Sequence, residues 1–149
     1  MTTSSKPPAR STPAVEDGTS GAGGKKRVLV VDDNQDAAEI LSEALLMMGY
    51  DTRCAHDGAA ALAVATTFLP EVALLDIGLP IMDGYELALR LRALPGLHGM
   101  RLVALTGYGQ DRDRARSVEA GFDEHLLKPI DLARVQQIVE GPGPKIVPG

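Results

Sequence analysis

The sequence predicts an α/β fold in which the strands of one parallel sheet alternate with helices. Short apolar runs recur along the chain, and segments with apolar residues at helical spacing follow them. The run at residues 72–75 is apolar throughout, as expected for a central strand that is covered on both faces. The sequence contains no internal repeat. This alternation favours parallel pairing of the strands with right-handed crossover connections.

The expected elements are bounded by residues that commonly begin or end helices. Gly49 and Gly121 are each expected to end a helix, and Asp83 is expected to cap one. Five strands are expected, at residues 27–31, 50–55, 72–75, 101–105 and 125–127. Five helices are expected, at residues 35–48, from 57 or 58 to 68, 84–93, 111–120 and 131–139. The helical residues expected to face the core are Ile40, Leu41, Ala44, Leu45, Met48, Leu62, Val64, Leu87, Leu91, Leu94, Ala115 and Val118.

The composition indicates one folded domain with a polar segment at each end. Of the 149 residues, those at 1–25 are mainly Ser, Thr, Pro, Gly and Ala, which bury too little surface to offset the entropy of ordering. We therefore expect a disordered N-terminal tail or linker at 1–25 and a folded domain at 26–140. A flexible C-terminal tail is expected at 141–149, where the sequence begins Gly-Pro-Gly-Pro.

Charge, cysteine content and hydropathy exclude several classes of protein. The net charge is −5 and no basic stripe is present, so direct nucleic-acid binding is not expected. Cys54 is the only cysteine, which excludes an internal disulfide and a multi-cysteine metal site; we expect a buried, unreactive thiol. No apolar stretch reaches the ~20 residues of a membrane span, and no signal-peptide core is present. A cytoplasmic protein without membrane insertion is therefore expected.

Reactive side chains follow four of the expected strands. Asp32 and Asp33 follow the first strand, Asp76 the third, Thr106 the fourth and Lys128 the fifth. Because the carboxyl ends of parallel strands share one edge of the sheet, these side chains are expected to converge on one cleft. Carboxylate and carbonyl oxygens suit Mg²⁺, and a cation, a lysine and a hydroxyl suit the charge of a phosphoryl group. Without a cation, the three neighbouring aspartates are expected to repel one another.

Four short motifs carry these side chains. They are VVDDN at 30–34, LD followed by LPIMDG at 75–84, ALTG at 104–107 and AGFDEHLLKP at 120–129. In this order and at these strand ends, they resemble the receiver domain of two-component response regulators, over residues 26 to about 139. The resemblance implies a flavodoxin-like, doubly wound (βα)5 sandwich. Its parallel five-stranded sheet would have the strand order 2-1-3-4-5.

The resemblance also implies roles at the first two motifs. Asp76 is implied to be the nucleophile that takes a phosphoryl group from a phosphohistidine. Asp33 is implied to be the main acidic ligand of Mg²⁺ or Mn²⁺, and Asp32 an indirect ligand through water or hydrogen bonds. The backbone carbonyl of Gly78 would complete the ligands that the protein supplies. The chain would then be a regulatory phosphoacceptor that assists its own phosphorylation and dephosphorylation, rather than an enzyme.

The last two motifs are implied to contact the phosphoryl group and to respond to it. Lys128 and Thr106 would each contact a phosphoryl oxygen, and the bond between Lys128 and Pro129 is expected to be cis. His125 stands where many receivers carry Tyr or Phe as a switch, and Tyr108 stands where small residues are frequent. With Thr106, they are candidates for an altered switch. The alternative is a partly exposed histidine and a loop tyrosine.

A purely structural alternative exists for each assigned residue. The alternatives are helix caps at Asp32, Asp33 or Asn34, a solvated loop acid at Asp76, a turn hydroxyl at Thr106 and a surface amine at Lys128. Asp83 and Gly84 are interpreted as a turn and a helix cap rather than as ligands. Neither His56 nor His98 is expected to be a phosphodonor or a ligand.

Three functions are compatible with these residues. The leading hypothesis is a phosphorelay receiver, either stand-alone or excised from a hybrid histidine kinase, because no recognisable effector follows residue 140. Its partners would be a sensor histidine kinase or a histidine phosphotransfer protein, and it would be a monomer or a weak dimer. A receiver that only binds partners is an alternative. An aspartate-nucleophile phosphatase is disfavoured, because Gly78 stands where such an enzyme needs a second acid.

Overall fold

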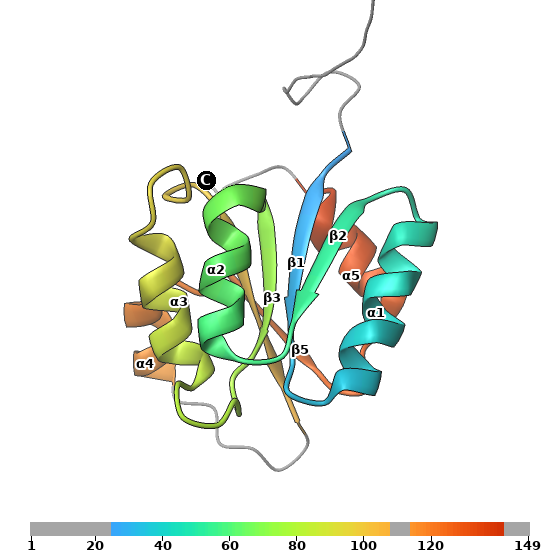
Figure 1. Cartoon of the computed structure of the whole chain (residues 1–149). Helices are drawn as coiled ribbons and strands as arrows, with labels where there is room; N and C mark the ends of the chain where they lie inside the picture. Colours follow the sequence, from blue (N-terminus) through green and yellow to red (C-terminus); the bar gives the residue numbers. More distant parts are fainter. Residues whose placement is uncertain (1–24, 108–113, 142–149) are drawn as a thin grey trace, which may run out of the picture.

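The computed structural model describes residues 25–107 and 114–141, which form a parallel sheet between two layers of helices (Figure 1). The strands are β1 (Arg27–Val31), β2 (Asp51–Ala55), β3 (Val72–Asp76), β4 (Arg101–Thr106) and β5 (Glu124–Leu127). The helices are α1 (Gln35–Met47), α2 (Gly58–Phe68), α3 (Gly84–Arg92), α4 (Arg114–Ala120) and α5 (Leu132–Val139). The strand order is β2-β1-β3-β4-β5, and neighbouring strands are parallel. The predicted flavodoxin-like fold is therefore confirmed.

The sheet is buried on both faces because alternate residues of a strand pack against different helices. In β1, Leu29 and Val31 belong to a core that α2 and α3 cover, whereas Val28 and Val30 belong to a second core beneath α1 and α5. All residues of β3 are buried. This two-sided burial explains why the central strand reads as a continuous apolar run.

Polar residues cap the first turn of four helices. The side chains that accept a backbone N–H there are Asn34 before α1, Asp57 before α2, Asp83 before α3 and Asp131 before α5. Because the first N–H groups of a helix have no partner within it, such caps fix where the helix begins. The predicted cap at Asp83 is confirmed. Asn34 caps α1, which leaves the carboxylates of Asp32 and Asp33 available for another role.

Two residues that helical spacing placed toward the core are exposed instead. Ile40 is 69% exposed and Val118 is 77% exposed, so both predictions were wrong. The buried residues of α1 are Ala38, Leu41, Ser42 and Leu45. They form a narrow stripe at i, i+3, i+4 and i+7 that turns Ile40 away from the sheet. In α4, Ser117 and Ala120 are buried instead of Val118.

Some expectations fall outside the described part of the chain. These are the tails at 1–24 and 142–149, the start of a helix at 111–113 and the side chain of Ala115. Cys54 is half-buried rather than buried. Burial, and then the charge of Glu39, raise the pKa of its thiol. Among the described residues, no helix has the length and apolar character of a membrane span.

Candidate functional site at the carboxyl edge of the sheet

Four strands deliver polar side chains to the carboxyl edge of the sheet. Asp32 directly follows β1, Asp76 and Thr106 are the last residues of β3 and β4, and Lys128 directly follows β5. Both β1 and β4 pair with β3, and β5 pairs with β4. The backbone N–H of Lys128 also donates to the carbonyl oxygen of Thr106 at 2.7 Å. The structure therefore brings these four residues to one edge, and the Lys128–Pro129 bond is cis, as predicted.

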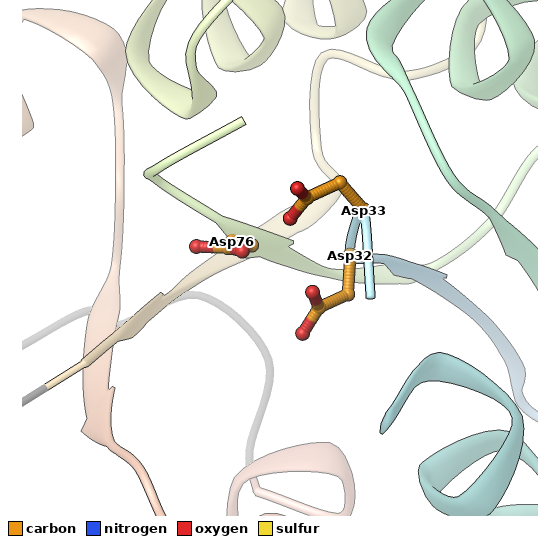
Figure 2. A group of neighbouring side chains, drawn as sticks. All are labelled: Asp32, Asp33 and Asp76. Carbon is orange, nitrogen blue, oxygen red and sulfur yellow. The ribbon is translucent and has the colours of Figure 1, made fainter. Parts of the chain in front are cut away.

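Three aspartates form the acidic part of the site. One carboxylate oxygen from each of Asp32, Asp33 and Asp76 lies within 4.8 Å of the other two (Figure 2). Asp32 and Asp76 are buried, whereas Asp33 is exposed. Several carboxylate oxygens at this spacing, with an open side toward solvent, suit Mg²⁺, which takes hard oxygen ligands and retains waters. The residues present therefore fit a divalent cation.

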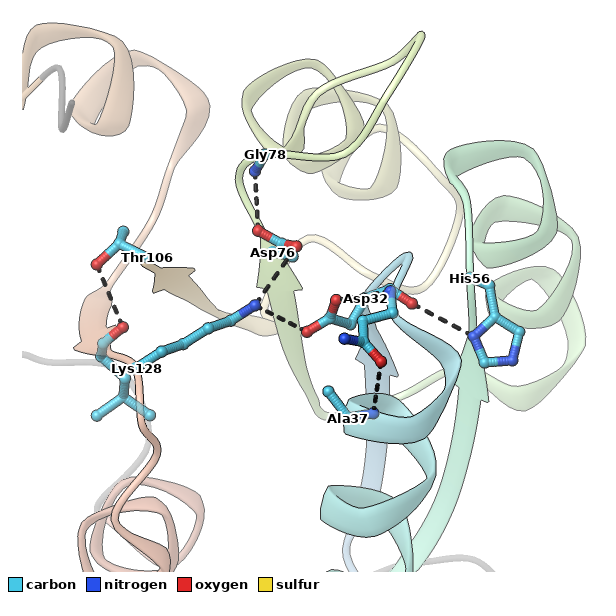
Figure 3. Close-up of polar contacts among 9 residues, drawn as sticks. Asp32, Ala37, His56, Asp76, Gly78, Thr106 and Lys128 are labelled. Carbon is cyan, nitrogen blue, oxygen red and sulfur yellow. Dashed lines mark hydrogen bonds and ion pairs between the residues drawn. The ribbon is translucent and has the colours of Figure 1, made fainter. Parts of the chain in front are cut away.

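Lys128 is the cation that faces these carboxylates. Its Nζ lies 2.9 Å from Oδ2 of Asp32 and 3.5 Å from Oδ2 of Asp76 (Figure 3). Burial lowers the pKa of Lys128, but its hydrogen bond to Asp32 and the charges of Asp76 and Asp32 raise it more. The net pKa lies above the ordinary value of a lysine. The amine therefore carries a positive charge at neutral pH.

Asp76 occupies the centre of the site. Its Oδ1 accepts a hydrogen bond of 2.9 Å from the backbone N–H of Gly78, and its other oxygen faces Lys128. Burial raises the pKa of Asp76, and the bond from Gly78 and the charge of Lys128 only partly offset this effect. The adjacent Asp32 raises the pKa further. One lysine therefore does not balance the buried negative charge at this edge.

Thr106 is buried, with only 1% of its surface exposed. Its Oγ1 donates to the carbonyl oxygen of Leu126 at 3.4 Å, a long hydrogen bond to the neighbouring strand β5. The hydroxyl is thus committed to β5 in this structure. A weak bond of this kind costs little to exchange for a stronger acceptor.

Gly84 allows the first turn of α3 to approach the backbone that follows β3. A Cβ at this position would lie 2.6 Å from Cα of Ile77 and 2.8 Å from the carbonyl oxygen of Asp76. The N–H of Gly84 also donates to the carbonyl oxygen of Ile77 at 3.2 Å. The N-terminus of α3 therefore packs directly against the main chain of Asp76.

Of the two further switch candidates, His125 lies within the described residues and Tyr108 does not. His125 lies in β5, is half-buried, and its Nε2 is 2.8 Å from Oγ of Ser117 in α4. Its ring also lies 6.1 Å from that of Phe122. His125 thus links β5 to α4. Tyr108 lies outside the described residues.

His56 contacts the backbone of Asp32, which was not foreseen from the sequence. Its Nδ1 lies 3.3 Å from the carbonyl oxygen of Asp32 (Figure 3). The signal was present in the strand pattern, because His56 directly follows a strand whose carboxyl end meets the same edge of the sheet. Its position beside Asp32 depends on the pairing of β2 with β1, in which Ala55 lies opposite Val31.

This fold and site define a two-component signalling module, and comparison with known proteins agrees. Residues 28–140 match the family model described as "Response regulator receiver domain". The chain therefore belongs to the receiver domain family of response regulators, which act in phosphorelay signal transduction. Proteins of this family are regulatory, and they typically bind Mg²⁺ through acidic residues.

Individual relatives differ in how much of their own length the chain covers. The transcriptional regulatory protein PrrA of Mycobacterium tuberculosis is 38% identical over 109 residues, which are 73% of this chain and 46% of PrrA. An uncharacterised 14.6 kDa protein of Leptolyngbya boryana is 34% identical over 113 residues, which are 76% of this chain and 86% of that protein. The chain thus spans about half the length of PrrA. The solved structure of the chemotaxis protein CheY4 of Vibrio cholerae is similar with a TM-score of 0.72 and 26% identity, over 78% of this chain and 99% of that one.

Proposed function

We propose that Asp76 is the phosphoacceptor of this receiver. In the reaction, a carboxylate oxygen of Asp76 forms a bond to the phosphorus of a phosphohistidine. The phosphorus–nitrogen bond breaks, and its electron pair stays with the imidazole of the donor. The observation that carries this proposal is the position of Asp76 at the end of the central strand, with Gly78 and Lys128 holding its two oxygens.

Lys128 and Thr106 are proposed to hold the phosphoryl group. The lysine already contacts Oδ2 of Asp76 at 3.5 Å, so it is placed to pair with an oxygen of a group attached there. Thr106 ends the neighbouring strand β4. We propose that its hydroxyl exchanges the long bond to Leu126 for a phosphoryl oxygen. His125 and Tyr108 are proposed to follow this change.

Mg²⁺, or Mn²⁺ in its place, is the proposed cofactor. Asp33 and Asp76 would be its carboxylate ligands, with the carbonyl of Gly78, and Asp32 would act indirectly. The close spacing of the three aspartates supports this assignment. When bound, the cation would neutralise charge on the phosphoryl oxygens and on these carboxylates. The same residues would assist hydrolysis of the phosphoaspartate, which makes the chain a self-limiting switch rather than an enzyme.

The proposed partners follow from the family. The donor would be a sensor histidine kinase or a histidine phosphotransfer protein in the cytoplasm. Phosphorylation would change a protein-binding surface of a monomer or weak dimer, without direct binding to nucleic acid. Residues 26–140 are proposed to suffice for phosphorylation, because every strand and helix of the described residues lies within this range.

Acetyl phosphate with Mg²⁺ tests the phosphoacceptor directly. We expect intact-mass spectrometry to show one added phosphoryl group on the wild-type protein and none on Asp76→Asn. The matched control is Asp83→Asn, which changes a carboxylate of the same loop that caps α3, and which should be labelled like wild type. EDTA should abolish labelling. Undiminished labelling of Asp76→Asn would show that another residue is the acceptor, and no labelling of wild type would favour a receiver that only binds partners.

A further inference from the structure

Asp32 is held at each of its polar atoms. Its N–H donates to the carbonyl oxygen of Ala55 at 3.2 Å. Its Oδ1 accepts from the N–H of Asn34 at 3.0 Å, and its Oδ2 accepts from Lys128. The remaining atom, the carbonyl oxygen, faces Nδ1 of His56 at 3.3 Å (Figure 3). His56 therefore completes the set of contacts that immobilises this residue.

The chemistry of this contact assigns the donor. Because a carbonyl oxygen can only accept a hydrogen bond, we assign the proton of the imidazole to Nδ1 of His56, the tautomer that can donate to Asp32. The contact joins two neighbouring strands, because Asp32 directly follows β1 and His56 directly follows β2. This contact continues the series of hydrogen bonds between β1 and β2, since the N–H of Asp32 already donates to the carbonyl oxygen of Ala55. The side chain of His56 thus extends the pairing of β1 with β2 by one step beyond the sheet.

The carbonyl group of Asp32, which His56 contacts, restricts the backbone conformation at Asp33. It belongs to the planar peptide unit that joins Asp32 to Asp33, so its direction is coupled to ψ of Asp32 and φ of Asp33. A rotation of this peptide would move the carboxylate of Asp33 relative to Asp76. Asp33 is exposed, so packing does not fix it. Its direction depends on the backbone from which it projects.

We propose that His56 is a positioning residue for the divalent-cation site. By donating to the carbonyl of Asp32, it fixes the peptide that aims the Asp33 carboxylate at the group formed with Asp32 and Asp76. This inference rests on the proposed function only in requiring that the three aspartates hold Mg²⁺. It assigns His56 no contact with the cation and no part in the phosphoryl transfer.

The test is the affinity of the full chain for Mg²⁺, measured by isothermal titration calorimetry without any phosphodonor. We expect His56→Ala to bind Mg²⁺ about threefold to tenfold more weakly, the effect of one lost hydrogen bond. His56→Asn should recover most of the affinity, because the amide nitrogen of Asn is as many bonds from Cα as Nδ1. His56→Gln places its donor one bond further and should not. His98→Asn is the control, since it removes an exposed histidine far from the aspartates in sequence.

A second measurement separates positioning from general stability. Thermal midpoints in EDTA should show that His56→Ala and His56→Asn are both fully folded at the temperature of the titration, so that their different Mg²⁺ affinities do not come from unfolding. Equal Mg²⁺ affinity of His56→Ala and wild type would overturn the inference alone, as would an Asn variant as weak as the Ala variant. Failure of the wild-type protein to bind Mg²⁺ would overturn both this inference and the proposed cofactor.

Discussion

The carboxyl and amino edges of the sheet differ in how their charged side chains are paired. At the carboxyl edge, Lys128 pairs with the buried carboxylates of Asp32 and Asp76, and the exposed carboxylate of Asp33 lies close to both. At the amino edge, cationic side chains meet a surplus of acceptors. The guanidinium of Arg92 donates to the carbonyl oxygens of His98, Met100 and Gly121 and lies 3.6 Å from Oδ2 of Asp123.

This difference suggests that one edge of the sheet mainly contributes to stability and the other to function. Arg92 ties the end of α3 to the turn after α4, and Arg101 donates to the carbonyl oxygen of Ile138 at 2.7 Å, which holds the end of α5. These contacts are complete within the protein. Among the described residues, the charge of Lys128 does not balance the carboxylates of the carboxyl edge, and the proposed divalent cation would offset the remainder. The amino edge should therefore set the free energy of unfolding, and the carboxyl edge should set the ligand chemistry.

The largest expected effect on stability is at the amino edge. Arg92→Ala removes the donor to two part-buried carbonyl oxygens, those of Met100 and Gly121, and should lower the free energy of unfolding by about 2–4 kcal/mol. Urea denaturation would measure it. The control is Arg90→Ala, which removes an exposed pair with Glu86 on the same helix and should cost only about 0.3–0.5 kcal/mol. If the two variants were equally stable, the amino edge would not have the role assigned to it.

The next effect concerns the metal at the carboxyl edge. Asp33→Ala should weaken Mg²⁺ binding by at least about tenfold, equivalent to ~1.4 kcal/mol, because it removes the exposed ligand. In EDTA, the same variant should unfold at a higher temperature than wild type, because one charge is removed from the repelling group. Calorimetry measures both. Asp83→Ala is the control for affinity, since Asp83 caps α3; equal losses in the two variants would contradict the role given to Asp33.

A smaller effect on stability is expected at Tyr50, at the amino end of β2. Its hydroxyl donates to Oε2 of Glu140 at 2.7 Å. Burial, and then the hydrogen bond to Glu140 and its charge, raise the pKa of Tyr50 from 10.0 to about 12. Because the folded pKa is the higher one, this contribution is present below pH 10 and is lost as the pH rises toward about 12. Tyr50→Phe should lose about 1 kcal/mol at neutral pH.

The pH dependence of the thermal midpoint provides a control for the prediction at Tyr50. Thermal midpoints of wild type and Tyr50→Phe should converge as the pH rises from 9 toward about 12, where the wild-type hydroxyl ionises. The comparison with Tyr85→Phe, at a buried tyrosine near the carboxyl edge, tests whether the effect is specific. A constant difference between wild type and Tyr50→Phe across this range would count against the assigned hydrogen bond.

The smallest effect is expected from removal of residues 1–24. The composition of this segment offers no apolar core, so we expect its deletion to leave both edges unchanged. The thermal midpoint and the rate of labelling by acetyl phosphate should equal those of the full chain. A matched deletion of 142–149 tests the other end. A large change in either measurement would move the proposed domain boundary.

The fold was predictable because the spacing of apolar residues that marks each strand and helix can be recognised within a short stretch of sequence. The strand at 27–31 was predicted with its observed bounds, since an apolar run marks it directly, and the start of the helix at 58–68 was predicted to within one residue. The errors at Ile40 and Val118 have one cause. Helical spacing identifies a set of apolar residues, but the width of the buried stripe depends on how the helix lies on the sheet.

The candidate site was predictable to the extent that it follows strand ends. Asp76 and Lys128 could be placed together because parallel strands share an edge. The predicted strand order places the end of β2 beside the end of β1, but the contact of His56 with Asp32 also depends on the side-chain rotamer of His56. The bond from Thr106 to Leu126 depends on a side-chain rotamer, which no periodicity in the sequence encodes.

The close approach at Gly84 has a consequence for mutational tolerance. Gly84 has no side chain beyond a hydrogen atom and contacts no ligand in the proposed reaction. Even a methyl group there would meet the main chain of Asp76 and Ile77, which are anchored at the end of the central strand. In a library that samples every residue at each position, Gly84→Ala should therefore rank with substitutions of Asp76, the proposed acceptor. A position can be intolerant of change because of the space it leaves empty.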